Sequence, residues 1–216
     1  MSTEANKDVS TEAAVTAAPE ITTSQISQTM MGLAIVWFVG ACALGISDVL
    51  LVYSRILFLF VVIPVIIFGT VFAFSPRLRA WAFALDSRLI ILLNMLRAGG
   101  LAFLMLYADG RLNGAFALPT GWMDFIVAFT APLAAFYLTP TRTTLRRLLL
   151  LAWIVFGIAD FAIAIPLGVV ARSQNPTSMI ATNQFPQVII PTFGVPLVVI
   201  GYFILLAQLW RQRRQA

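Results

Sequence analysis

Residues 148–170 read LLLLAWIVFGIADFAIAIPLGVV, and Asp160 is the only ionisable side chain among them. A helix of about 20 mainly apolar residues is long enough to cross a hydrocarbon core of ~30 Å. The run is continuous, whereas the strands of a membrane barrel alternate apolar and polar residues over about ten positions. The segment therefore predicts a transmembrane α-helix.

Apolar runs of the same kind fill most of the chain. They cover residues 30–52, 56–74, 89–107, 121–138 and 188–210. The composition agrees, because 60% of the residues are hydrophobic and only 11% are charged, against about 25% charged in a soluble domain. The sequence thus predicts an all-α integral membrane protein, a bundle of six transmembrane helices over residues 30–210.

The two ends of the chain are polar. Residues 1–29 contain few large apolar side chains, so we expect a disordered cytoplasmic tail. Residues 211–216 form a short basic tail, also expected in the cytoplasm.

The distribution of Lys and Arg predicts the orientation in the membrane. Lys7 and three arginines in each of the segments 75–88, 139–147 and 211–216 fall on one side of a six-helix arrangement. The other side receives Arg55, Arg111 and Arg172. Because cytoplasmic loops are enriched in Lys and Arg, we expect a multi-pass protein of the cell (plasma or inner) membrane with both termini in the cytoplasm.

The sequence lacks the residues that several kinds of cofactor binding and catalysis require. The chain has no histidine, Cys42 is the only cysteine and Lys7 the only lysine. His-ligated haem or zinc and His-based general base catalysis are excluded, and no Walker phosphate loop, HExxH or GxSxG motif occurs. We expect no cofactor, no metal and no nucleic-acid partner, since no basic stripe is visible. The expected partners are the lipid bilayer and a small-molecule substrate, and the oligomeric state stays open.

Two short segments are repeated. Residues 45–48 (GISD) resemble 157–160 (GIAD), and residues 64–69 (PVIIFG) resemble 196–201 (PLVVIG). One interpretation is three helical hairpins with a weak parallel repeat of helices 1–2 and 5–6, an architecture that some transporters use. The other is chance, because Gly, Pro and Ile are common in spanning helices.

Ionisable residues inside a span are costly, by about 2.5–3.5 kcal/mol on insertion scales, and they usually pair in the bundle interior. Arg97 lies near the middle of the third predicted span and Asp160 at a similar depth in the fifth. We therefore predict that Arg97 and Asp160 lie within direct or one-water reach. Asn94 is one helical turn before Arg97 on the same face.

Two more aspartates, Asp48 and Asp124, occur near predicted span ends. Each has an interfacial interpretation, which the sequence favours for Asp124. If all three aspartates face inward, carboxylates outnumber the single arginine.

Backbone features add weaker predictions. Pro196 cannot donate to the carbonyl of Thr192, and a freed carbonyl of this kind is tolerated where it is buried or lines a cavity. Gly99 and Gly100 predict close helix packing. The segment 108–120 is expected as an interfacial loop or as a lid.

Three functions remain open at this level. The first is a small-solute carrier, for an anionic solute or linked to protons, whose mid-membrane site contains Arg97, Asp160, Asn94, Asp48 and Asp124. The second is a membrane-embedded enzyme that acts on a lipid or isoprenoid with an aspartate as general acid. The third is a non-catalytic scaffold or complex subunit in which the Arg97–Asp160 pair only fixes helix register. The absence of His and of catalytic motifs favours a role other than an enzyme.

Overall fold

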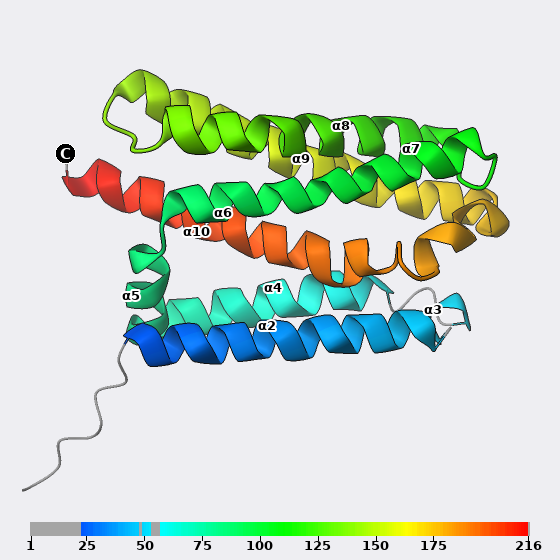
Figure 1. Ribbon diagram of the computed structural model, residues 1–216, viewed down its shortest axis with the longest axis horizontal. Coiled ribbons are helices and arrows are strands. Elements are labelled where there is room, and N and C mark those ends of the chain that lie inside the picture. The colour runs from blue at the N-terminus through cyan, green and yellow to red at the C-terminus, as the bar shows by residue number, and fades with distance from the viewer. Residues whose placement is uncertain (1–22, 48, 53–56, 216) are drawn as a thin grey trace, which may run out of the picture.

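The structure is a computed structural model that describes residues 23–47, 49–52 and 57–215. It is 89% helical, and no strand occurs among the described residues (Figure 1). The elements in chain order are α2 (Thr23–Ile46), α3 (Val49–Val52), α4 (Leu57–Phe74), α5 (Pro76–Ala84), α6 (Ser87–Leu92), η2 (Leu93–Gly100), α7 (Leu101–Ala108), α8 (Gly114–Leu133), η3 (Ala134–Leu138), α9 (Thr144–Gln174), η4 (Pro176–Asn183), η5 (Ile190–Gly194) and α10 (Val195–Gln215).

The prediction of an all-α membrane bundle is confirmed. Five continuous helical segments are long and apolar enough to cross a membrane, and the bent pair of α4 and α5 brings the number to six. α4 is an apolar helix of 18 residues, about 27 Å at 1.5 Å per residue. The axis turns by 106° between Phe74 and Pro76, so α5 lies across one end of the bundle (Figure 1).

The start of α5 follows from its sequence, although we expected residues 75–88 only as a loop. Ser75 has extended backbone and its hydroxyl accepts a hydrogen bond from the Leu78 amide, as an N-cap residue does. Pro76 follows at the first helical position, where its fixed φ and missing N–H fit the helix.

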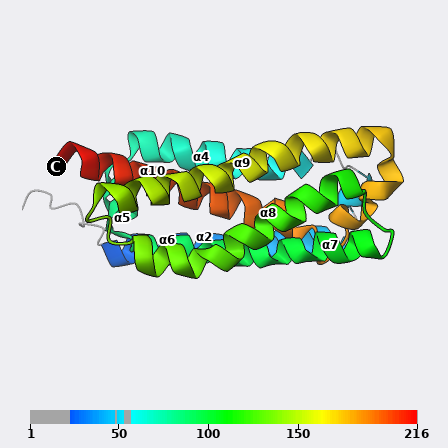
Figure 2. The ribbon, with the colours of Figure 1, turned by 90° about the horizontal axis from the view of Figure 1, so that it is seen from above.

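α10 is the central element of the bundle. It packs against α4, α5, α6, α9 and η2, and it lies between the α2/α4 pair and the α8/α9 pair (Figure 1). α4 and α9 both lie toward the same face of the bundle when it is seen from above (Figure 2).

Two helices begin seven residues before their predicted spans. α2 begins at Thr23, inside the predicted tail 1–29, and residues 1–22 lie outside the described residues. α8 begins at Gly114, so most of the expected loop 108–120 is helical. Asn113 caps this helix, since its side-chain oxygen accepts a hydrogen bond from the Ala115 amide at 2.8 Å.

The described segments that the charge count assigned to one side gather at one end of the bundle, whereas Lys7 lies outside the described residues. This arginine-rich end is formed by α5, the segment 139–143 and the C-terminal part of α10 (Figure 1). The opposite end carries the turn between α7 and α8, together with η4.

The bundle has two apolar cores, one toward each of these two ends. The larger core lies toward the arginine-rich end and includes Ile91, Leu150, Ile154, Tyr202 and Leu205. The smaller one lies toward the opposite end and includes Phe103, Phe116 and Met179.

Candidate functional site

Arg97 is the centre of a buried ionic cluster. It belongs to η2, a 3₁₀ segment that joins α6 to α7 within one long spanning helix. Its exposed fraction is only 5%. A 3₁₀ stretch in the middle of a helix often marks a functional hinge or local strain.

Two carboxylates bind the guanidinium. Its Nε donates to Oδ1 of Asp124 at 2.7 Å, and its Nη2 donates to Oδ2 of Asp160. Both aspartates are buried, with 5% and 1% exposed. The predicted pairing of Arg97 with Asp160 is confirmed. The interfacial interpretation of Asp124 is wrong, because α8 begins seven residues before the predicted span and carries Asp124 into the interior.

The guanidinium has little capacity left for another ligand. Nη1 donates to the carbonyl oxygen of Gly157 at 3.1 Å and to the hydroxyl of Tyr202 at 2.9 Å. Together with the two carboxylates, these acceptors take four of the five N–H groups that an arginine carries. Phe161 covers one face of the group, with Cζ of Arg97 4.4 Å from the ring centroid, a cation–π geometry.

The charges within this cluster do not balance. Two carboxylates face one guanidinium in a buried environment, where each uncompensated charge is costly. The cluster is neutral when a proton or another cation joins it.

Two glycines make room for the cluster. A Cβ at Gly100 would overlap the side chain of Asp124, and a Cβ at Gly157 would overlap the hydroxyl of Tyr202. Close helix packing at Gly100, predicted from the sequence, is therefore found against the α8 residue that holds Arg97. The role of Gly157 was missed.

Tyr202 was also missed, although the sequence contains a signal for it. Tyrosines of membrane proteins concentrate at the two interfaces, but Tyr202 lies in the middle of the predicted span 188–210. A buried tyrosine hydroxyl usually has a hydrogen-bond partner, and here the partner is Arg97.

The other predicted site residues do not join the cluster. Asn94 is buried, but its amide donates to the backbone carbonyls of Ile90 at 3.4 Å and Ile91 at 3.2 Å in its own helix. Asp48 lies outside the described residues, so its place in the site and in the suggested repeat stays a prediction.

A cavity of about 670 Å³ leads to the cluster from the opposite end. It runs along α9 from Arg172 and the exposed Ser173 to Asp160, about 18 Å at 1.5 Å per residue. Asp124 and Asp160 lie at its deep end, and most of the remaining wall is apolar. The lining side chains come from α4, α7, α8, α9, η4, η5 and α10.

Two side-chain oxygens at the deep end of the cavity lack hydrogen-bond partners in the described part of the chain. Oδ1 of Asp160 and Oγ1 of Thr120 are buried and have no hydrogen-bond partner among the described residues. Both residues line the cavity. Buried polar atoms are normally satisfied, and a hydrogen-bond donor at the base of the cavity would satisfy these two oxygens.

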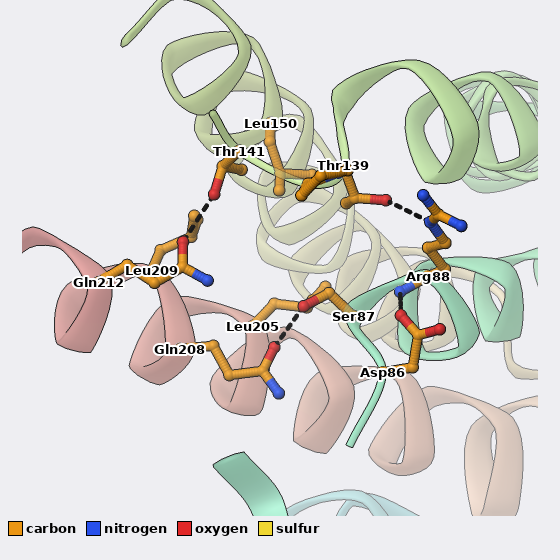
Figure 3. A pocket seen from close by; sticks show the side chains of 11 residues that line it. Asp86, Ser87, Arg88, Thr139, Thr141, Leu150, Leu205, Gln208, Leu209 and Gln212 are labelled. Atoms are coloured by element: carbon orange, nitrogen blue, oxygen red, sulfur yellow. Dashed lines mark hydrogen bonds between the residues drawn. The ribbon is translucent and has the colours of Figure 1, made fainter. Parts of the chain in front are cut away.

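A smaller pocket of about 260 Å³ lies at the arginine-rich end. Hydrogen bonds cross it (Figure 3): Ser87 donates to Gln208 at 2.7 Å, and Thr141 donates to Gln212 at 2.6 Å. No residue lines both cavities. Between this pocket and the ionic cluster lie large apolar side chains of the larger core, Ile91 and Ile154 among them.

The start of α10 confirms one backbone prediction. The carbonyl of Thr192, which Pro196 leaves free, accepts a hydrogen bond from Nε1 of Trp37 in α2 at 3.1 Å. Thr192 belongs to η5, one turn of π-helix. α2 thereby binds the irregular turn that leads into the central helix.

No group of three or more Asp, Glu, Cys or His within the described part of the chain is placed to hold a metal ion. Residues 53–210 match the family described as Domain of unknown function (DUF8737). This match covers most of the chain, so the protein belongs to that family. No curated protein and no solved structure matches it.

Proposed function

We propose that this member of the DUF8737 family is a proton-linked carrier of a small solute in the cell membrane. Its site consists of Arg97, Asp124, Asp160 and Tyr202 at the base of the large cavity. The observation that carries the proposal is the position of an ionic cluster with one excess carboxylate at the closed end of a cavity that reaches exposed residues at one end of the bundle.

The asymmetry of access supports a carrier. A carrier needs a binding site that is reached from one side at a time, with a barrier on the other side. Here the cavity gives access from the end opposite the arginine-rich end. The larger core, which contains Ile154 and Leu205, forms the barrier on the other side. By the distribution of arginines, the cavity faces away from the cytoplasm.

The charge balance supports a proton or a cation rather than an anion. An anionic solute would have to displace Asp124 or Asp160 from a guanidinium whose N–H groups are nearly all engaged. A proton on one carboxylate instead removes the excess charge and weakens one ion pair. Protonation would then change the contacts between η2, α8 and α9, which is how a coupling ion can change a carrier's conformation.

A membrane enzyme that acts on a lipid is the second candidate, and the cavity lining favours it. Ile165 and Val169 are part of the wall and are 39% and 63% exposed on the surface of α9. Oδ1 of Asp160 is the oxygen that would serve as general acid, since Oδ2 is bound to Arg97. Product formation from a defined lipid would favour this candidate over the carrier.

Cysteine accessibility tests the carrier. Cys42 is the only cysteine, so a Cys42→Ala background gives clean single-cysteine reporters. Ala164→Cys reports the cavity and Ile154→Cys reports the inner barrier, both labelled with a hydrophilic maleimide in nanodiscs. We expect acidification to change the two labelling rates in opposite directions by about threefold or more, as for a shift between two states.

Two exposed positions serve as controls for the intrinsic pH dependence of thiol labelling. These are Ser173→Cys at the mouth and Thr143→Cys at the arginine-rich end. In the Asp160→Asn variant, both reporters should lose their pH response relative to these controls. Reporters that keep constant relative rates at every pH would contradict the carrier and favour a scaffold.

A further inference from the structure

We infer that the large cavity binds an organic cation: a molecule with an apolar, ring-containing body and one ammonium group that contacts Asp160 and Thr120. This inference rests on the proposed site and names the class of its substrate.

The deep end of the cavity contains acceptor oxygens to which a ligand could donate hydrogen bonds. Oδ1 of Asp160 accepts no hydrogen bond from a described residue, and its carboxylate is 1% exposed in total. A carboxylate oxygen is only an acceptor, and an ammonium group offers three donors without an acceptor. Thr120 Oγ1 can accept a second of these N–H bonds.

Charge makes an ammonium a better ligand than a neutral hydroxyl. The cluster has one carboxylate more than it has guanidinium groups, and a bound monocation neutralises it. Charge-assisted hydrogen bonds are roughly twice as strong as neutral ones. A proton and an organic cation would neutralise the same excess charge, so their binding should be mutually exclusive.

The walls of the cavity select for an apolar body. Phe103, Phe116 and Phe161 line it together with aliphatic side chains such as Ile190 and Val195. A volume of about 670 Å³ falls in the range of ~300–1,000 Å³ that small-molecule pockets have. Because Phe161 already covers Arg97 and the rings of Phe103 and Phe116 contact each other, these side chains contribute an apolar wall for the body of the ligand.

Arg172 is the opposing charge at the mouth. Its guanidinium donates to Oδ1 of Asn183 at 2.9 Å and to Oγ1 of Thr182 at 3.4 Å, which ties it to η4. It lies about 18 Å from Asp160 along α9. Because the Coulomb energy falls with distance, a direct contact with Asp160 outweighs the repulsion from Arg172.

Equilibrium binding of three matched probes tests this class in the full-length protein in nanodiscs. 1-Naphthylmethylamine is a cation at neutral pH, 1-naphthalenemethanol is neutral and 1-naphthoate is an anion, and all three share one ring system. We expect the amine to bind at least about tenfold more tightly than the alcohol, and the anion to give no saturable binding.

Variants connect this preference to the cavity. Asp160→Asn should remove the advantage of the amine over the alcohol. Because that variant risks misfolding, Thr120→Val provides a test that leaves all ion pairs intact, and it should weaken amine binding by about two- to fivefold. Ala164→Trp fills the cavity without changing any charge and should abolish binding of both the amine and the alcohol.

The possible outcomes separate this inference from the proposed carrier. Preferred binding of 1-naphthoate, equal binding of the amine and the alcohol, or amine binding that survives Ala164→Trp would each overturn the organic-cation site. Tight amine binding without any pH-dependent change in cysteine accessibility would support the binding site and reject the carrier. An accessibility change without amine binding would support the carrier and reject this substrate class.

Discussion

The two halves of the bundle are built from the same kinds of apolar side chains, yet the space beside the ionic cluster is filled in one half and open in the other. Toward the arginine-rich end, Ile91 and Ile154 are 0% exposed and belong to the core that separates the smaller pocket from the cluster. Toward the opposite end, residues of α9 such as Ile165 and Gly168 border a cavity of about 670 Å³. The ionic cluster of Arg97 lies at the boundary between the two halves.

The ionic cluster has different hydrogen-bond partners toward the two halves. On the closed side, Tyr202 and the Gly157 carbonyl complete the hydrogen bonds of Arg97. On the cavity side, Asp160 and Thr120 each keep one oxygen without a described partner. The cluster is therefore fully hydrogen-bonded on the closed side and, within the described residues, has unpaired acceptors on the cavity side.

Removing the charge at the boundary should have the largest effect. Arg97→Leu leaves two buried carboxylates without their cation, and breaking a buried pair in this way costs about 3–5 kcal/mol in soluble proteins. We expect a large loss of folded protein, measured by size-exclusion chromatography in detergent. Arg97→Leu combined with Asp160→Leu should not restore folding, because Asp124 then stays buried without its cation.

The triple variant Arg97→Leu, Asp124→Leu, Asp160→Leu is the matched control, since no charge of the cluster remains. It should fold better than either Arg97→Leu or the double variant. If the double variant folds as well as the triple one, an unpaired Asp124 is tolerated in the interior, contrary to this expectation.

The closed half should be more sensitive to loss of packing than the open half. Ile154→Ala removes a side chain that is 0% exposed, and an Ile-to-Ala change in a packed core costs about 2–5 kcal/mol. Ile165→Ala makes the same chemical change at the cavity wall and should cost less than about 1 kcal/mol. Equal losses in reversible unfolding in mixed micelles would contradict the division into two halves.

A pair of glycines in α9 offers a finer comparison. Gly157→Ala introduces a Cβ that overlaps Tyr202, and overpacking of this kind costs about 1–3 kcal/mol. Gly168→Ala meets Phe116 at only 3.4 Å, an ordinary contact, and it should be neutral or slightly stabilising because alanine is the better helix former. Thermal unfolding followed by tryptophan fluorescence distinguishes the two.

The smallest expected effect concerns the attachment of α2. Trp37→Phe removes the hydrogen bond to the Thr192 carbonyl and should cost about 0.5–1.5 kcal/mol. Trp81→Phe removes a bond of similar length, 2.9 Å to Ser27 at the exposed arginine-rich end, and should cost less because water can replace it. A larger loss for Trp81→Phe in the same thermal assay would show that α2 is held mainly at the arginine-rich end.

Long-range features of the fold were predictable because lipid imposes them. The apolar runs had to be helices, and an isolated Arg97 had to find Asp160 at its own depth. What failed was local: residues 108–120 contain Asn113, Gly114 and Pro119, which are typical of turns, yet they begin α8. That seven-residue error moved Asp124 by about 10 Å along the membrane normal and disguised it as an interfacial residue.

Gly157 and Tyr202 illustrate a second limit. Hydropathy and spacing show which residues share a depth, but not which helix faces which. The contact between these two residues depends on α9 packing beside α10, and a single sequence carries no direct signal for that neighbourhood.

The 3₁₀ form of η2 has a mechanical consequence. A 3₁₀ helix rises ~2.0 Å per residue and an α-helix ~1.5 Å, so a return of these 8 residues to α geometry would shorten the segment by about 4 Å. Because the turn per residue also falls from ~120° to ~100°, the same transition would rotate Arg97 by roughly a fifth of a revolution about the helix axis. A small change in winding within this one helix would therefore both shift and rotate the Arg97 guanidinium relative to Asp124 and Asp160, which lie on other helices.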